Sequence, residues 1–383
     1  MRKAFDYLIG TLAFLSATFY IPGQTFNDSQ SMIFRAAALS IIVIAFYFNP
    51  VRSLKSRWIN TFMLLMLVSF LFNKDSRAIS IRPLVDSYLM FFMFYAIINN
   101  LQDRNVIYGA IVGIIVVNML MVYMQILRMD PLCLDDQARH NTHIVGLFGY
   151  PMNLGAWMAC ALPYVFHKNK WLFIPVFLMM VMSDSWAAIG VGIIGLMFYI
   201  WFWNKKIFKG ACYLIIAASI LVSLYCVFTL SSVQKKEIIN KVTLRVETQV
   251  PLIRPILSRP YFGYGLGTWQ VVIPQVKEID HDRIGLIDVT WCDPLGCALE
   301  LGLISVFLMF CFFRAEVRKF IQSRKDLELV SLFGSLITIS LGMLFHSYMN
   351  YINISVFCVL MYCVYRIKQE EISYEDSVCR SKA

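Results

Sequence analysis

The stretch VIYGAIVGIIVVNMLMVYMQIL, residues 106–127, contains no charged residue. A helix rises 1.5 Å per residue, so roughly 20 mostly apolar residues are enough to cross the hydrocarbon of a bilayer. Gly109 and Gly113 lie four positions apart within the run, a spacing that lets a neighbouring membrane helix pack closely. The run therefore predicts a transmembrane helix.

Runs of the same kind fill most of the chain. Of its 383 residues, 59% are hydrophobic and only 15% are charged, whereas soluble domains average about 25% charged. We expect an all-α, polytopic membrane helix bundle of about twelve transmembrane helices, forming a single domain over residues 1–383. The expected spans are 5–22, 31–49, 58–72, 83–98, 106–127, 151–166, 171–183, 186–203, 210–230, 294–313, 327–345 and 351–365.

The basic residues predict the orientation. Of the 34 Lys and Arg residues, 20 fall in loops on the side of the N-terminus, six in short loops on the other side, and eight in the long segment 231–292. Short cytoplasmic loops are enriched in Lys and Arg, whereas long loops do not follow this rule. Both termini are therefore expected in the cytoplasm, and residues 231–292 form a large external loop between spans nine and ten. This distribution also argues against nucleic-acid binding, despite the net charge of +10.

The external loop contains an amphipathic segment and, overlapping it, a sequence motif. Its charged residues surround five apolar ones, Val250, Leu252, Ile253, Ile256 and Leu257, which predicts short helices on the membrane face. The segment RVETQVPLIRPILSRPYFGYGLGTW, residues 245–269, resembles the signature of the O-antigen ligase and polysaccharide polymerase superfamily. In that family an Arg is followed by a charged residue, a Pro and a Gly-rich turn. Here Arg245 stands 14 residues before Arg259, and the turn holds Gly263, Gly265 and Gly267.

Three further stretches agree with this resemblance. GLFGYPMNLGAWMACALPYVF, residues 146–166, looks like the family's Gly-x-Phe-Gly-Asn-Pro-Asn motif at span six, with Asn153 at the second Asn. ALELGLISVFLMF, starting at Ala298, looks like the Glu-Leu-Gly-Leu beginning of span ten, and His346-Ser347 ends span eleven as in many members. The similarity covers roughly residues 140–365.

The resemblance implies glycosyl transfer without a metal or another cofactor, in a bacterial inner membrane. The donor would be a polyprenyl-diphosphate-linked glycan, and the acceptor a hydroxyl of a lipid or glycan. Arg suits the diphosphate because its planar fork bonds two oxygens at once; headgroup binding is the alternative for these arginines. The expected catalytic residue is Arg245, and the expected substrate-binding residues are Arg254, Arg259, Asn153, Gly263 and Gly265.

Two motifs depart from the family. Its presumed catalytic His falls on Trp291 here, and its Ser-Arg-Gly after span seven reads Ser183-Asp184-Ser185. Both differences affect residues tied to chemistry. A non-catalytic relative, or a lipid-glycan transporter with the same fold, is therefore the alternative function.

Asp293 and His281 are the titratable residues that could replace the missing His. Asp293 could equally be the N-cap of the helix that begins at Pro294. His281 belongs to Asp280-His281-Asp282, which reads as a solvated loop or as an Asp-x-Asp metal motif. That metal motif serves nucleotide-sugar enzymes in the cytoplasm, whereas this loop is expected outside, so we expect no metal.

Overall fold

The computed structural model describes residues 2–18, 26–48, 57–129, 144, 146–148, 151–183, 185–229, 249–269, 271–272, 292–324, 326–345 and 352–382. These described segments contain helices and turns but no strand. The helices are α1 (Arg2–Thr18), α2 (Phe26–Phe48), α3 (Arg57–Phe72), η1 (Lys74–Ser76), α4 (Arg77–Asn100), α5 (Asn105–Ile126), α7 (Pro151–Lys168), α8 (Lys170–Met182), α9 (Trp186–Trp203), α10 (Lys205–Thr229), η2 (Val250–Leu252), α12 (Ile253–Ser258), α14 (Asp293–Leu301), α15 (Leu303–Ser323), α16 (Leu327–Phe345) and α17 (Ile352–Lys382).

Five of these helices are long and apolar enough to cross a membrane. The all-α class is therefore confirmed for the described residues, these five helices are consistent with a helical membrane protein, and each of the twelve apolar runs overlaps a helix. The number of crossings itself stays a prediction. The expected division between the spans 171–183 and 186–203 is present, because α8 ends at Met182 and α9 begins at Trp186. The five candidate spans are Ser29–Tyr47, Lys74–Asn100, Asn105–Ile126, Trp186–Trp203 and Leu327–Phe345.

The run 294–313 is not one helix but two. Gly302 has φ 81° and ψ 172° and separates α14 from α15. A Cβ at this position would overlap the backbone carbonyl of Tyr261. The break is therefore set by a distant loop, which the hydropathy of the run does not reveal.

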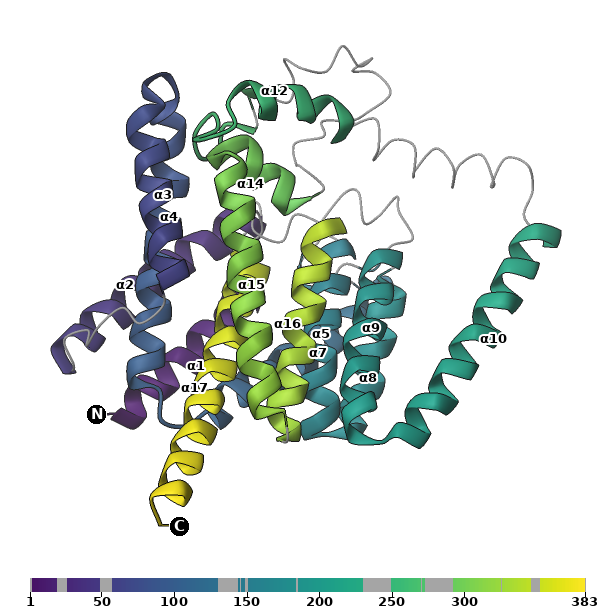
Figure 1. The fold of residues 1–383 in the computed structure, drawn as a ribbon. Helices are drawn as coiled ribbons and strands as arrows, with labels where there is room; N and C mark the ends of the chain where they lie inside the picture. The colour runs from purple at the N-terminus through teal and green to yellow at the C-terminus, as the bar shows by residue number, and fades with distance from the viewer. Residues whose placement is uncertain are drawn as a thin grey trace.

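The core of the bundle is built around α7. Its residues from Asn153 to Val165 are buried, including the whole side chain of Trp157. α7 packs against α8, α9 and α16, and the Trp157 ring lies 4.5 Å from that of Phe357 on α17. α10 packs on α9 at its base and leans away from the other helices (Figure 1).

The two ends of the molecule differ. Both termini lie at one end, whereas α12, α14 and the connection between α3 and α4 lie at the opposite end (Figure 1). This agrees with the expectation that the termini share one side of the membrane. Which side is cytoplasmic stays a prediction.

Candidate functional site

The predicted short helices are present in the loop before α14. η2 and α12 cover residues 250–258. Leu252 and Ile256 are buried in a small apolar cluster with Ala298 and Leu299 of α14. Arg254 lies on the exposed side of α12. The amphipathic pattern thus docks this segment onto α14.

The glycine-rich turn caps the end of α14. Its Gly263, Gly265 and Gly267 have positive φ angles of 60°, 103° and 71°. The amide of Tyr264 donates to the Leu299 carbonyl and the amide of Gly265 to the Glu300 carbonyl, both at 2.9 Å. Carbonyls in the last turn of a helix have no partner within the helix. The turn supplies these partners where Gly302 breaks the chain of helical hydrogen bonds.

The other side of the turn is held by α3 and η1. The Ser69 hydroxyl donates to the Phe262 carbonyl at 2.7 Å, and the Ser76 hydroxyl to the Tyr264 carbonyl at 2.8 Å. A Cβ on Gly263 would overlap the backbone of Glu300, and one on Gly265 would lie 2.5 Å from the Ser76 hydroxyl. These glycines permit close packing within the chain, and their contact with a substrate stays a prediction.

Glu300 is a partly buried acid that none of the sequence motifs indicated. Its carboxyl accepts hydrogen bonds from the backbone amides of Gly267 and Trp269. Its other oxygen, Oε1, is buried without a hydrogen-bond partner in the segments described. Glu300 is the only charged residue in the run 294–313, and an acid in such a run is costly unless it has a role. A single acid within an otherwise uncharged apolar run is thus the sequence feature that indicates Glu300.

Arg259 presents a cation beside this turn. Its guanidinium lies over the Tyr264 ring at 4.5 Å, and its Nη1 donates to Oδ1 of Asn73 at 3.3 Å. The Tyr264 hydroxyl is itself fixed by Ser258 at 2.9 Å. Arg259 is exposed, and neither it nor Arg254 has a carboxylate partner within the described ranges. The remaining N–H groups of Arg259 can therefore bind an anion.

Asp293 is the first residue of α14 and is only 3% exposed. The N-cap position belongs to Cys292, so the interpretation of Asp293 as the N-cap is wrong. Its carboxyl lies close enough to Cys297, Glu300 and Cys358 to act on each electrostatically. A carboxylate in the first turn also interacts favourably with the helix dipole. Asp293 is therefore an interior acid at the start of α14.

Asn153 lies inside the bundle on α7 and is 2% exposed. Trp157 and Cys160 follow it by four and seven residues, so the three share one face of the helix. The indole nitrogen of Trp157 is buried with no hydrogen-bond partner in the described residues.

The segment before α7 is held by α5. The backbone amide of Gly146 donates to the Gln125 side chain at 3.0 Å, and that of Leu147 donates to the Asn118 side chain at 2.9 Å.

The expected residues therefore fall into two groups. Arg254, Arg259, Gly263 and Gly265 lie together around the end of α14, and Asp293 begins that same helix. Asn153 belongs to the interior face of α7. Arg245, His281 and Trp291 lie outside the described residues. No group of three or more His, Cys, Asp or Glu residues in the described segments is arranged to hold a metal ion.

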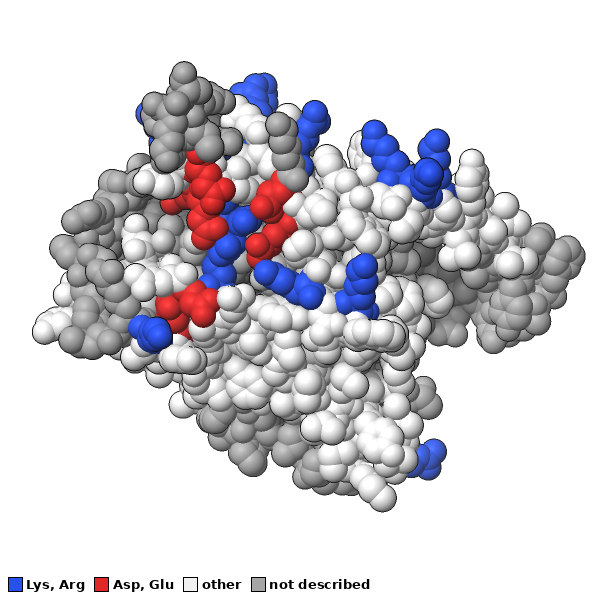
Figure 2. Space-filling view, turned by 90° about the horizontal axis from the view of Figure 1, so that it is seen from below, with Lys and Arg blue, Asp and Glu red and all other residues white. Residues whose placement is uncertain are grey.

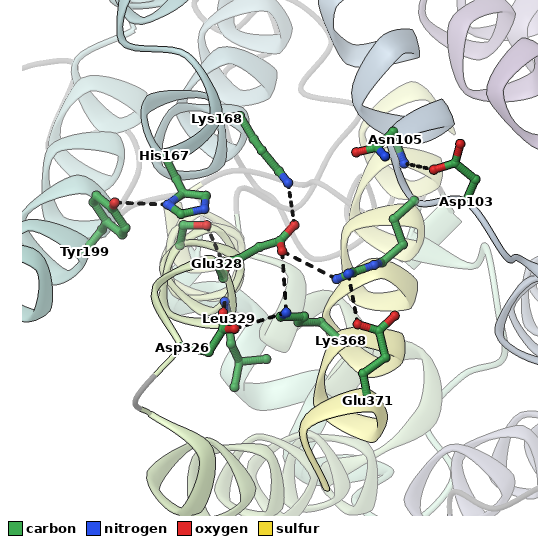
Figure 3. Close-up of polar contacts among 12 residues, drawn as sticks. Asp103, Asn105, His167, Lys168, Tyr199, Asp326, Glu328, Leu329, Lys368 and Glu371 are labelled. Carbon is green, nitrogen blue, oxygen red and sulfur yellow. Dashed lines mark hydrogen bonds and ion pairs between the residues drawn. The ribbon is translucent and has the colours of Figure 1, made fainter. Parts of the chain in front are cut away.

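At the end that carries the termini, charged residues form a separate network (Figure 3). Glu328 contacts Lys168 at 2.7 Å, and Arg104 and Lys368 at 3.7 Å each. Lys368 also contacts Asp326 at 3.0 Å, and Arg104 contacts Glu371 at 2.9 Å. Figure 2 shows acidic side chains interleaved with basic ones on this end of the molecule. Three cations face three carboxylates, so the network joins α7, α16 and α17 to the α4–α5 connection without leaving a charge for a ligand.

Burial affects the titration of two groups at this end. Burial opposes the ionisation of Asp326, but the Leu329 amide and the Lys368 ammonium outweigh it and hold the pKa of Asp326 below its usual value. Burial lowers the pKa of His167, whose Nδ1 lies 3.1 Å from the Tyr199 hydroxyl. His167 is therefore neutral at pH 7.

No protein-family model matches the sequence, and no curated protein matches it. The functional assignment consequently depends on the motifs and on the arrangement of residues around α14.

Proposed function

We propose that this chain is a membrane glycosyltransferase of the O-antigen ligase or polymerase type. It moves a glycan from a polyprenyl-diphosphate carrier to a hydroxyl of a lipid or glycan acceptor. The setting is the assembly of cell-surface polysaccharide, such as lipopolysaccharide, at a bacterial inner membrane. The observation that supports this most is Arg259, whose exposed guanidinium is oriented by Tyr264 and Asn73 and has no carboxylate partner in the described chain.

The chemistry assigns a role to each group. The acceptor hydroxyl attacks the anomeric carbon, the bond from that carbon to the diphosphate oxygen breaks, and the hydroxyl proton passes to a base. Arg245 and Arg259 stabilise the negative charge that develops on the leaving diphosphate. Arg254, Asn153, Gly263 and Gly265 contribute to substrate binding. Asp293 or His281 orients or deprotonates the acceptor.

The second candidate is a non-catalytic relative or a lipid-glycan transporter. The observation in its favour is Trp291 at the position of the family's His, together with Ser183-Asp184-Ser185 in place of Ser-Arg-Gly. Such a protein would bind the same donor without transferring its glycan.

A transfer assay with the purified chain and a polyprenyl-diphosphate glycan donor tests the proposal. We expect turnover in the unchanged protein, its loss in Arg245→Ala and a strong decrease in Arg259→Ala. The lysine variants at both positions should restore activity only in part, because Lys keeps the charge but not the fork. Arg318→Ala, an exposed change on α15, is the matched control. Donor binding without transfer in the unchanged protein would favour the second candidate.

A further inference from the structure

Four lysines gather where α8 and α10 begin. Lys170 starts α8, and Lys205, Lys206 and Lys209 lie in the first turns of α10. All four are exposed, and none has a carboxylate partner within the described segments. Figure 2 shows basic side chains standing on uncharged surface, apart from the interleaved network. Unlike that network, this cluster leaves its positive charge available.

Tryptophans place these lysines at the level of lipid headgroups. Trp171 is 81% exposed and Trp201 is 51% exposed, and the Lys170 ammonium lies 4.5 Å from the centre of the Trp203 ring. Trp side chains are enriched at membrane–water interfaces, because they have an apolar body and a polar N–H group. Lysines beside them therefore meet the phosphate region of the bilayer.

The part of α10 that follows the lysines, as far as Leu221, presents exposed apolar side chains. Tyr213, Leu214 and Leu221 are 72%, 73% and 67% exposed. α10 packs mainly on α9 (Figure 1). Acyl chains cover such a surface in a bilayer. A phospholipid thus suits both parts of this helix, because its headgroup can meet the lysines while its acyl chains cover the apolar side chains.

The charge selects the kind of phospholipid. Residues 185–229 contain no Asp or Glu, so no nearby carboxylate of this stretch competes for the ammonium groups. Each Lys close to an anionic membrane surface strengthens binding roughly fivefold at moderate salt. We propose that the base of α10, with Lys170, Lys205, Lys206 and Lys209, is a binding surface for anionic phospholipid headgroups.

Native mass spectrometry of the full chain in neutral detergent tests this surface. The probes are phosphatidylglycerol and phosphatidylcholine with identical acyl chains. We expect the unchanged protein to retain phosphatidylglycerol at least tenfold more tightly. The variant Lys205→Gln/Lys206→Gln/Lys209→Gln should bind the two lipids about equally, and the same three positions changed to Arg should keep the preference. The control variant Lys3→Gln/Lys74→Gln/Lys319→Gln changes the net charge by the same amount outside the lysine cluster. It should keep most of the preference for phosphatidylglycerol.

Three results would overturn the proposal: equal binding of both lipids by the unchanged protein, full preference in the triple Gln variant, or loss of preference in the triple Arg variant. Circular dichroism shows whether each variant is folded. If the triple Gln variant does not fold, the single changes decide. Lys205→Gln should then lower the preference severalfold. If every single variant keeps the full preference for phosphatidylglycerol, the proposal is contradicted.

Discussion

Glu300 shows how a single side chain can hold a loop over a helix break. Its backbone carbonyl accepts the Gly265 amide at 2.9 Å, and its carboxyl accepts the amides of Gly267 and Trp269. The turn that it holds is the one that presents Arg259. We therefore regard Glu300 as a positioning residue for that arginine rather than as a catalytic one.

Glu300→Ala should loosen this turn. Two backbone donors lose their buried acceptor, which costs about 1–3 kcal/mol. Glu300→Gln keeps an acceptor oxygen and should behave much more like the unchanged protein. Hydrogen exchange at the Gly267 and Trp269 amides measures the effect, and Asp75→Ala, an exposed acid at the same end, is the control. Unchanged exchange in Glu300→Ala would show that the carboxyl does not anchor the turn.

Gly302→Ala should destabilise the protein, because the φ of 81° and the contact with Tyr261 both require glycine. A non-glycine residue in such a conformation costs on the order of 1–3 kcal/mol. Gly190→Ala on α9 is the matched control, since a Cβ there meets nothing within 4 Å. Thermal unfolding in detergent should show a lower midpoint for Gly302→Ala alone. Equal midpoints would contradict the account of the helix break.

Among the elements, the ends of α7, α16 and α17 and the connection before α5 are joined by the ion network of Figure 3. The pKa of Asp326 is held below its usual value in the folded protein, and the unfolded value is about 3.9. Its contribution to stability is therefore complete above the unfolded pKa and is lost as the pH falls through the folded pKa.

Asp326→Asn should thus reduce stability at pH 7 and make it less sensitive to acid. Unfolding midpoints measured between pH 7 and pH 3 compare this variant with the unchanged protein. The difference should shrink toward the acid end, because Asp326 is then protonated in both states. Asp75→Asn, at the opposite end, should parallel the unchanged protein. A difference that grows at low pH would reverse the assigned sign.

The existence of the helices could be predicted from the sequence, because long apolar runs have few alternatives in a bilayer. Their exact limits could not. α10 begins at Lys205 rather than Gly210, because the Asn204 side chain accepts the Lys206 amide at 2.9 Å. The glycine turn was recognisable from its motif, but the groups that hold it were not. Ser69 and Glu300 reach the turn from helices distant in sequence, and such contacts leave no local pattern.

At the scale of the whole molecule, the arrangement separates two chemically different ends. One end carries the termini and the other carries α12 (Figure 1). The balanced ion network belongs to the first end, and Arg259, which directly follows α12, and the glycine turn belong to the second. The proposed transfer needs the second end to face the compartment that holds both the lipid-linked glycan and the acceptor. The distribution of Lys and Arg predicts that this end is external.

Labelling of single introduced cysteines with a membrane-impermeant maleimide in intact cells tests this orientation. Ser258→Cys on α12 and Arg318→Cys on α15 are both exposed positions at opposite ends. We expect Ser258→Cys to react from outside and Arg318→Cys to react only after lysis, because the lipid barrier protects the cytoplasmic end. The unchanged protein gives the background from its native thiols. Reaction of Arg318→Cys in sealed cells would invert the orientation and contradict the proposal that Arg259 meets its donor outside the cell membrane.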